Sequence, residues 1–250
     1  MPKSANDPDM SHMRSSDFKL VYEFNDDTYL LVDALEKDYI HSHLLKTLTG
    51  KENSPQLKFC LEIGCGSGYV TTFVYKLLNS CYEKFLKSSG VSFCLLCTDI
   101  NPNAAAMTWK TFERNMKQSP KFIPSLFDVV LCDFASAFEK RLKNKIDLLI
   151  FNPPYVPCEK DEMGFSDVRA AYAGGENGRE VIDRFLPMVK NILSPNGVFY
   201  FVLIEDNNPQ EIMKLMSQEE YGSFQSSVVL KKRVQGEHLY IVKFEGSTRK

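Results

Sequence analysis

Short apolar strands alternate with helical segments along most of this 250-residue chain, and this alternation constrains its fold more than any other feature. The expected strands are residues 59–63, 93–97, 127–132, 147–151 and 198–204. The expected helices between them are residues 69–78, 104–116 and 179–193. Strands that alternate with helices form crossover units on a parallel sheet, and two final alternating runs, 227–233 and 238–244, indicate a hairpin. We therefore expect an α/β fold: a seven-stranded, mainly parallel, doubly wound sheet with a C-terminal antiparallel hairpin.

The sequence predicts a polar N-terminal tail followed by one domain. Residues 1–15 have neither periodicity nor an apolar face, and we expect them to be disordered. Residues 16–250 contain no Gly/Ser-rich or charged linker, so they are expected to form a single domain. A hydrophobic content of 44% is enough for a sizeable core at this length.

Charge and cysteine usage exclude several classes of partner. Thirty basic and thirty-two acidic residues give a formal charge of −2, so no global field attracts nucleic acid or an anionic membrane. No apolar run approaches the roughly 18 residues of a membrane span. The seven cysteines are odd in number and lie in apolar runs, which suits a reducing compartment rather than a set of disulfides. Cys94 and Cys97 are expected to face opposite sides of a strand, so no metal site is expected there. We expect location in the cytoplasm, with the nucleus as a second location.

The turn after the first expected strand, Glu62-Ile63-Gly64-Cys65-Gly66-Ser67-Gly68, combines an acid with three glycines. Ligands of doubly wound sheets bind at the carboxyl ends of the strands, and Gly64 and Gly66 permit close approach of a ligand to the backbone. Tyr69 stands where a dinucleotide site would have its last glycine. The Glu62 carboxylate suits a ligand with a positive centre, because it would repel a pyrophosphate.

The next two expected strands also end on acids: Asp99, and Asp133 followed by Phe134. An acid in the position of Asp99 can accept hydrogen bonds from both hydroxyls of a ribose. Asp133 can accept from an adenine amino group while Phe134 packs on the adenine ring. Each acid alone could equally cap the following helix. Together they imply a cofactor with an adenine, a ribose and a cationic centre but no phosphate, which describes S-adenosylmethionine.

The fourth expected strand runs into Phe151-Asn152-Pro153-Pro154-Tyr155. The prolines fix φ, remove backbone donors and hold the preceding residues in extended conformations. The amide oxygen of Asn152 and the carbonyl of Pro153 can then accept both hydrogens of an –NH2 group, with Tyr155 as a flat wall. Taken alone, Asn-Pro is also common where a strand ends in a turn.

Upstream of the sheet, Asp26-Asp27-Thr28 precedes apolar residues at helical spacing and marks the start of a helix. The run Val21-Tyr22-Glu23 before it is expected to be extended. On residue chemistry alone, capping of this helix is the favoured role of Asp27 and Thr28.

These motifs, in this order, resemble a class I S-adenosylmethionine-dependent methyltransferase of the HemK type, which has a Rossmann-like fold. Within that family, Val21-Tyr22-Glu23, Asp26-Asp27-Thr28 and residues 173–180 resemble the eukaryotic and archaeal branch, which methylates the glutamine of the Gly-Gly-Gln motif in class 1 translation release factors. The match covers residues 20–245. It implies a protein-glutamine N5-methyltransferase that acts in translation termination.

The resemblance also implies a role for each site residue. Glu62 and Gly64 would line the methionine end of the cofactor, and Thr28 would contact it from the N-terminal helix. The full set expected to bind the cofactor is Thr28, Glu62, Gly64, Gly66, Asp99, Asp133, Phe134 and Asn152. The residues expected to hold the substrate amide for catalysis are Asn152, Pro153 and Tyr155.

The branch is known to require a small zinc-binding activator subunit, so the resemblance implies a heterodimer as well as a release-factor substrate. In this sheet topology the strand that ends at Cys132 is expected to be an edge strand. Its unpaired backbone suits strand addition by the activator, and the strand carries Leu126, Phe127, Val129, Val130 and Leu131.

Two other substrates remain open. A lysine ε-amine could also donate to Asn152 and Pro153 if it arrived deprotonated, although no base is assigned. The N6 amino group of adenine in nucleic acid has similar chemistry, but the near-neutral charge and the lack of a basic stripe count against it.

Overall fold

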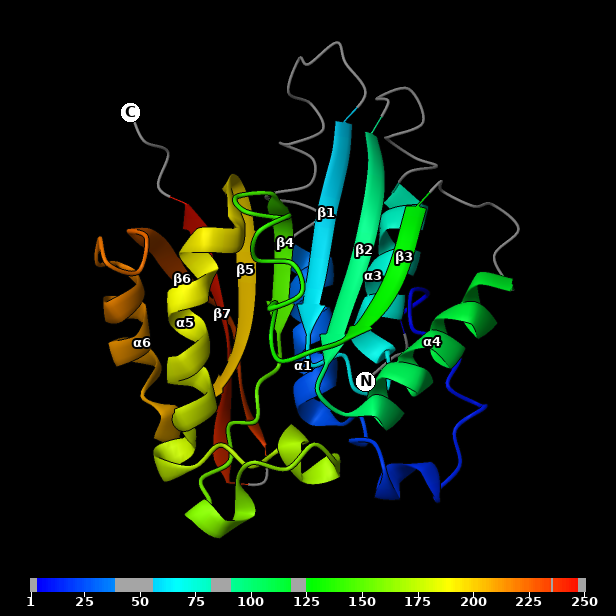
Figure 1. The fold of residues 1–250 in the computed structure, drawn as a ribbon, viewed down its shortest axis with the longest axis horizontal. Helices are drawn as coiled ribbons and strands as arrows, with labels where there is room; N and C mark the ends of the chain where they lie inside the picture. Colours follow the sequence, from blue (N-terminus) through cyan, green and yellow to red (C-terminus); the bar gives the residue numbers. More distant parts are fainter. Residues whose placement is uncertain (1–3, 39–55, 82–90, 118–124, 235, 247–250) are drawn as a thin grey trace.

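The computed structural model describes residues 4–38, 56–81, 91–117, 125–234 and 236–246. Its centre is a seven-stranded sheet with the order β3-β2-β1-β4-β5-β7-β6 (Figure 1). The strands are β1 (Gln56–Ile63), β2 (Val91–Asp99), β3 (Ser125–Leu131), β4 (Ile146–Phe151), β5 (Leu193–Ile204), β6 (Phe224–Val234) and β7 (Glu237–Gly246). Strands β1 to β5 pair in parallel, and β7 runs antiparallel to both β5 and β6. The predicted mainly parallel sheet with a C-terminal antiparallel hairpin is confirmed.

Helices cover both faces of this sheet. They are α1 (Asp26–Ala34), α3 (Tyr69–Cys81), α4 (Pro102–Lys117), α5 (Glu180–Ile192) and α6 (Pro209–Met216). Helices α1, α3 and α4 lie on one face, whereas α5 and α6 lie on the other (Figure 1). The α/β crossover pattern expected from the sequence therefore produces a three-layer arrangement.

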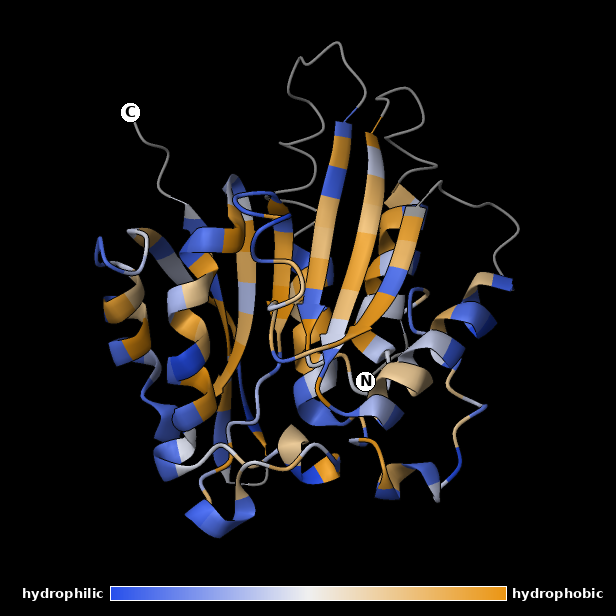
Figure 2. Cartoon of the chain, in the orientation of Figure 1, coloured by the Kyte–Doolittle hydropathy of each residue, from blue (hydrophilic) through white to orange (hydrophobic). Residues whose placement is uncertain are grey.

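The core consists of two apolar layers that the sheet separates. Strand β5 contributes to both, because alternate side chains point to opposite faces: Tyr200 and Val202 pack with α1 and α3, while Phe199 and Phe201 pack with α5. All four side chains are fully buried. Central strands of a parallel sheet are covered on both sides, and Figure 2 shows them as nearly continuous hydrophobic bands.

The strand order places the chemistry-bearing turns together. Strand β1 pairs with β2 on one side and with β4 on the other, so the order reverses at β1. The carboxyl ends of these parallel strands meet at one edge of the sheet, which is where ligands of such folds bind. The turns that begin at Gly64, Ile100 and Asn152 therefore converge.

The N-terminal segment corrects one expectation. Residues 1–15 are predicted to be disordered, but residues 4–15 lie against the helices of one face. Asp9 N donates to Asn115 Oδ1 at 2.7 Å, and Arg114 Nε donates to Asp9 Oδ2 at 2.9 Å. At the other end, the side chains of Ser4 and Asn6 donate to Glu36. Polar bonds to distant helices hold this segment, and such bonds leave no periodicity in the sequence.

None of the helices in the described residues is long and apolar enough to cross a membrane. In the same part of the chain, no three His, Cys, Asp or Glu side chains are grouped so that they could hold a metal ion.

Candidate active site

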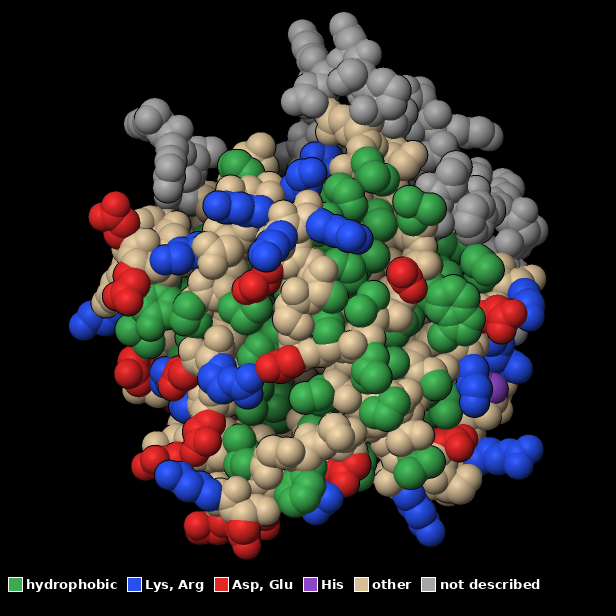
Figure 3. Space-filling view, viewed as in Figure 1, with side chains coloured by type: hydrophobic (Ala, Val, Ile, Leu, Met, Phe, Trp, Pro, Cys, Tyr) green, Lys and Arg blue, Asp and Glu red, His purple; other side chains and the backbone are tan. Residues whose placement is uncertain are grey.

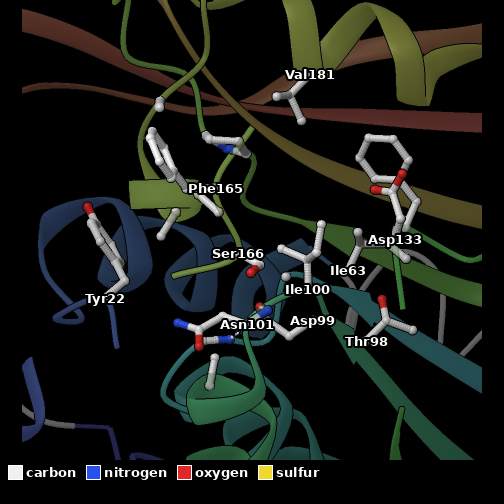
Figure 4. A pocket seen from close by; sticks show the side chains of 18 of the residues that line it. Tyr22, Ile63, Thr98, Asp99, Ile100, Asn101, Asp133, Phe165, Ser166 and Val181 are labelled. Carbon is white, nitrogen blue, oxygen red and sulfur yellow. Dashed lines mark hydrogen bonds between the residues drawn. The ribbon is translucent and has the colours of Figure 1, made fainter. Parts of the chain in front are cut away.

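A cavity of about 240 Å³ lies at the carboxyl ends of β1, β2 and β4, and Figure 4 shows the side chains around it. The predicted residues on its wall are Gly64, Gly66, Asp99, Asp133, Phe134 and Asn152. The predicted residues outside the wall are Thr28, Glu62, Pro153 and Tyr155. These four are buried or half-buried and do not line the cavity. The roles of all ten residues in binding or catalysis stay predictions.

The glycine turn after β1 brings the backbone close to the cavity. Gly64 has a φ of +67°, and its N–H donates to the Thr98 carbonyl of β2 at 2.8 Å. Gly68 has a φ of +77°, and a Cβ there would lie 2.7 Å from the Cα of Thr108 in α4. Glycine is therefore required at position 68 both for its backbone conformation and for the approach of α4.

Asp99, at the end of β2, is held rigidly at the cavity. Its Oδ2 accepts from Gly66 N and its Oδ1 from Asn101 N, each at 2.9 Å. Burial raises the pKa of this carboxyl, and the backbone donors of Asn101 and Gly66 oppose that rise. Each carboxylate oxygen keeps a further lone pair, so Asp99 can still accept bonds from vicinal hydroxyls, as predicted for a ribose.

Asp133 and Phe134 form the far end of the cavity, together with Arg184 of α5. Arg184 Nη2 donates to Asp133 Oδ2 at 2.7 Å, and its guanidinium lies 5.1 Å from the centroid of the Phe134 ring. Phe134 has a φ of +47°, a rare conformation for a residue with a side chain. A planar base could pack against this ring while the other oxygen of Asp133 accepts its amino group.

The catalytic turn after β4 is tied to helix α1 through one carboxylate. Asp27 Oδ2 accepts from Asn152 Nδ2 at 3.0 Å and from the Tyr155 hydroxyl at 2.8 Å. It also accepts from the Tyr22 hydroxyl at 3.2 Å. Burial, followed by the charge of Asp27, raises the pKa of Tyr22 to about 12 and raises that of Tyr155 further. Both phenols therefore stay protonated donors.

This geometry leaves one acceptor unused. With Nδ2 of Asn152 bound to Asp27, the opposite atom of the amide, Oδ1, is buried and has no hydrogen-bond partner among the described residues. A buried acceptor without a donor is costly. Asn152 also lies on the cavity wall, so an –NH2 group bound beside it could supply the missing donor.

The capping role predicted for Asp27 and Thr28 is wrong. The N-cap of α1 is Asn25, whose side chain accepts from Asp27 N. Thr28 lies inside the helix, and its hydroxyl donates to Asp27 Oδ1 at 3.1 Å. The chain contains a better cap one residue before the helix, which frees the Asp27 carboxylate to cross to the catalytic turn.

The segment 156–178 forms one side of the cavity and contributes Met163, Phe165 and Ser166 to the wall. Its end is fastened by Asn207, a fully buried side chain after β5. Asn207 Nδ2 donates to the carbonyls of Tyr155 and Asn177, both at 3.0 Å. One amide thus joins the catalytic turn to the end of the covering segment.

Glu62 lies behind the glycine turn in a buried polar cluster. Its carboxylate accepts from the Thr71 hydroxyl, which also contacts Cys97 Sγ at 3.0 Å. Burial raises the pKa of Glu62 to about 8, against the opposing bonds from Thr71. A cationic group bound nearby would favour the ionised form, consistent with the predicted preference for a ligand with a positive centre.

Sequence reasoning missed Arg184, Asn207 and the hydroxyl of Tyr22. Arg184 and Asn207 act on residues about fifty positions away. Arg184 lies within α5, and Asn207 lies in the turn after β5, which carries none of the predicted motifs. Tyr22 lies in a run that was expected to be extended, and the sequence does not show which way its side chain points. Only the tertiary fold brings these side chains to the cavity.

The chain is similar to known methyltransferases over nearly its whole length. It is 38% identical over 240 residues to human methyltransferase HEMK2, covering 96% of each chain. It is 33% identical to the eRF1 methyltransferase catalytic subunit mtq2 of Schizosaccharomyces pombe, covering 86% of this chain and 85% of mtq2. Among solved structures, it resembles a chain of the E. cuniculi Mtq2–Trm112 complex, which methylates the eRF1 translation termination factor, with 25% identity, a TM-score of 0.50 and coverage of 91% and 99%. No family model matches the chain.

The buried carboxyl of Glu62 makes stability depend on pH. Because its folded pKa of about 8 lies above the ordinary value of 4.5, the folded state binds more protons, and stability falls as the pH rises between these values. The variant Glu62→Gln has no such proton, so we expect urea midpoints of the wild type to fall relative to this variant between about pH 5 and about pH 8. Parallel curves for the two proteins would contradict the raised pKa.

Proposed function

The chain belongs to the methyltransferase family of HEMK2 and mtq2, and we propose that it methylates the side-chain amide nitrogen, N5, of the glutamine in the Gly-Gly-Gln motif of a class 1 translation release factor. The observation that carries this proposal is the buried, unpaired Oδ1 of Asn152 on the cavity wall. It suits a primary amide, whose nitrogen carries two hydrogens to donate. We also propose that the reaction takes place in the cytoplasm, with the nucleus as a second location.

The residues around the cavity fit S-adenosylmethionine as the cofactor. Asp99 would hold the ribose hydroxyls, and Asp133 with Phe134 would hold the adenine. The methionine end would extend along Gly64 toward Asn152, near the buried Glu62 carboxyl. When bound, this cofactor supplies a methyl group on a positively charged sulfur, which needs no acid to activate its leaving group.

Catalysis in this proposal is positioning of a weak nucleophile. The lone pair of an amide nitrogen is delocalised into its carbonyl, so the nitrogen attacks poorly. Asn152 Oδ1 and the Pro153 carbonyl would each accept one amide hydrogen, which raises the electron density on nitrogen and fixes its direction. The extra proton can leave to water after transfer, so no side chain has to act as a base.

Asp27 is a positioning residue in this scheme. Its carboxylate can only accept hydrogen bonds, so it selects the rotamer of Asn152 in which Nδ2 faces the helix. That rotamer leaves Oδ1 without a partner, so it is the atom that would accept from the substrate amide. The Tyr155 hydroxyl on the same carboxylate fixes the other end of the turn.

We also propose that a small zinc-binding activator subunit docks on β3. Strand β3 lies at one edge of the sheet and pairs only with β2 among the described strands. Leu126 and Leu131 on it are 67% and 55% exposed, and Trp109 of α4, 49% exposed, lies 5.4 Å from the ring of Phe127. Figure 3 shows hydrophobic side chains gathered over this part of the sheet. An unpaired strand edge with exposed apolar side chains suits addition of a partner strand.

Transfer of labelled methyl from S-adenosylmethionine to a class 1 release factor tests the proposed function, with the activator present. We expect label on the release factor that is lost when the Gly-Gly-Gln glutamine is replaced by alanine. Label that persists in this variant, or that appears on a lysine peptide or an oligonucleotide instead, would overturn the substrate.

Removal of the Asn152 acceptor tests the mechanism. Asn152→Ala should lower kcat by about 10²-fold or more, by analogy with the loss of an oxyanion-hole donor, while cofactor affinity changes little. Asp27→Asn should also lower kcat, because an amide at position 27 no longer fixes the rotamer of Asn152. Steady-state kinetics and calorimetric titration of the cofactor measure the two effects. Near-normal turnover of Asn152→Ala would refute the mechanism.

Substitution on the two edges of the sheet tests the docking of the activator. Leu126→Glu on β3 should weaken activator binding about 10- to 100-fold, since burial of a leucine contributes about 1.5–3 kcal/mol. Val228→Glu on β6, the opposite edge, is the matched control, because Val228 is 38% exposed. Calorimetry of each variant with the activator gives the affinities. Equal binding by both variants would place the activator elsewhere.

A further inference from the structure

The sequence motif at residues 173–180 has no role in the reaction as described so far, and the structure places it directly behind the catalytic turn. Val156, the residue after that turn, forms an isolated parallel bridge with Ala173. Val156 N donates to the Tyr172 carbonyl at 3.1 Å, and Gly174 N donates to the Val156 carbonyl at 2.9 Å. The chain therefore leaves the catalytic turn, forms one side of the cavity and returns to the same turn before α5 begins.

Two glycines of this motif lie against backbone carbonyls of the catalytic turn. A Cβ at Gly174 would lie 2.7 Å from the carbonyl oxygen of Pro154, and a Cβ at Gly178 would lie 1.9 Å from that of Tyr155. Gly178 also has a φ of +66°, a conformation that favours glycine. A side chain at either position would displace the turn. The motif and the turn are therefore packed backbone against backbone.

Asn207, in the turn after β5, bonds to both the motif and the catalytic turn. Its side chain is fully buried, and its Oδ1 accepts from Ile204 N at 2.9 Å. The two hydrogens of Nδ2 go to the carbonyls of Tyr155 and Asn177, both at 3.0 Å. The amide has no further hydrogen to donate to a ligand. Any effect of Asn207 on the reaction therefore passes through the backbone that it holds.

Arg179 of the same motif holds Asn207 from behind. Its Nη1 donates to the Asn207 carbonyl at 3.1 Å and to Glu211 Oε2 of α6 at 3.2 Å. Its Nη2 donates to Asp183 Oδ1 of α5 at 2.7 Å. The rigid fork of a guanidinium can bond several acceptors at once. Arg179 therefore ties the backbone of Asn207 to the helices on that face of the sheet.

The peptide group that follows Tyr155 is held on both of its sides. Its carbonyl accepts from Asn207, and its N–H, which belongs to Val156, donates to the Tyr172 carbonyl. The side chain of Tyr155 is held separately, because its hydroxyl donates to Asp27 at 2.8 Å. Backbone and side chain at the exit of the catalytic turn are therefore both fixed.

The two prolines transmit this restraint to the reacting group. Their rings fix φ at positions 153 and 154, so few rotations separate the held peptide group from the Pro153 carbonyl. Asp27 holds the entry of the turn through Asn152, and Asn207 holds its exit. With the exit released, the Pro153 carbonyl could move relative to Asn152 Oδ1. A displacement of about 1 Å in a catalytic site can lower the rate about 10²-fold.

We propose that Asn207, packed on residues 173–180 and held by Arg179, is a positioning residue for methyl transfer. It sets the direction in which the Pro153 carbonyl meets the substrate amide. The inference rests on the proposed function for the reaction, whereas the hold of Asn207 on the turn is a property of the fold alone. The motif at residues 173–180 thereby acts on the reaction from behind the turn.

The variant Asn207→Asp tests this role. It keeps the size of the side chain but replaces Nδ2 by an oxygen, which carries one hydrogen at most. At least one of the carbonyls of Tyr155 and Asn177 therefore loses its donor. We expect kcat to fall about 10- to 100-fold, while the KM for the release factor and the Kd for the cofactor change less than about threefold. An unchanged kcat, or a Kd that rises as much as kcat falls, would overturn the proposal.

Asn208→Ala is the matched control. Asn208 is the next residue along the chain, and its side chain caps α6 by accepting from Glu211 N. Loss of the cap should lower the urea midpoint, while kcat stays at the value of the wild type. If this variant loses as much kcat as Asn207→Asp, loss of local stability explains both effects, and the positioning role is refuted.

Arg179→Met provides a second test that leaves the side chain of Asn207 in place. It keeps much of the apolar stem of the arginine and removes the bond to the Asn207 carbonyl. We expect kcat to fall about 3- to 10-fold at an unchanged Kd for the cofactor. If Asn207→Asp does not fold, this variant decides, and wild-type turnover by Arg179→Met would overturn the proposal.

Hydrogen exchange tests the hold on the turn without turnover. In Asn207→Asp the Val156 amide should exchange about 10-fold faster or more than in the wild type, because the peptide group that carries it opens locally. The Leu149 amide in β4 should exchange as in the wild type. The same Val156 amide should be unaffected in Asn208→Ala. Unchanged exchange at Val156 in Asn207→Asp would contradict the proposal.

The two failures can be told apart. If the wild type does not methylate the release factor at all, the proposed function fails, and exchange at Val156 still decides whether Asn207 holds the turn. If the wild type and Asn207→Asp methylate the release factor with the same kcat, the positioning role is overturned while the proposed function stands.

Discussion

The carboxylate of Asp27 is the interaction on which the site depends. It accepts hydrogen bonds from Asn152, Tyr155 and Tyr22, and so joins the first helix, the extended run before it and the turn after β4. Because a carboxylate has no hydrogen to donate, it binds the nitrogen end of the Asn152 amide and leaves the oxygen end without a partner. The acceptor that remains free is then a consequence of the fold and not of the substrate.

Helix α1 also borders a second cavity. One face of the helix carries Leu30 and Leu31 into the core, and Asp27 reaches the catalytic turn from it. The opposite side carries Asp26, Tyr29 and Asp33 to a separate cleft. A short helix ahead of the sheet therefore supports the catalytic turn on one side and lines a second cavity on the other.

Much of this could be predicted from the sequence, for physical reasons. Apolar runs and glycine turns report local structure, so they predict the strands and the order of the motifs. They also predict that Asp99, Asp133 and Asn152 lie on one cavity wall. The role of Asp27 could not be predicted from the sequence, because an acid at the start of a helix is normally interpreted as its N-cap. In the structure Asn25 is the N-cap instead. Arg184, Asn207 and the placement of residues 4–15 depend on polar contacts between distant segments, for which a single sequence carries no spacing signal.

The most direct test of the account is the structure of the protein with a Gly-Gly-Gln peptide and S-adenosylhomocysteine, the product form of the cofactor. The account predicts that the glutamine nitrogen lies within hydrogen-bond distance of Asn152 Oδ1 and the Pro153 carbonyl, while Asn152 Nδ2 remains on Asp27. A glutamine side chain bound elsewhere, or an Asn152 amide turned so that Nδ2 faces the peptide, would contradict it.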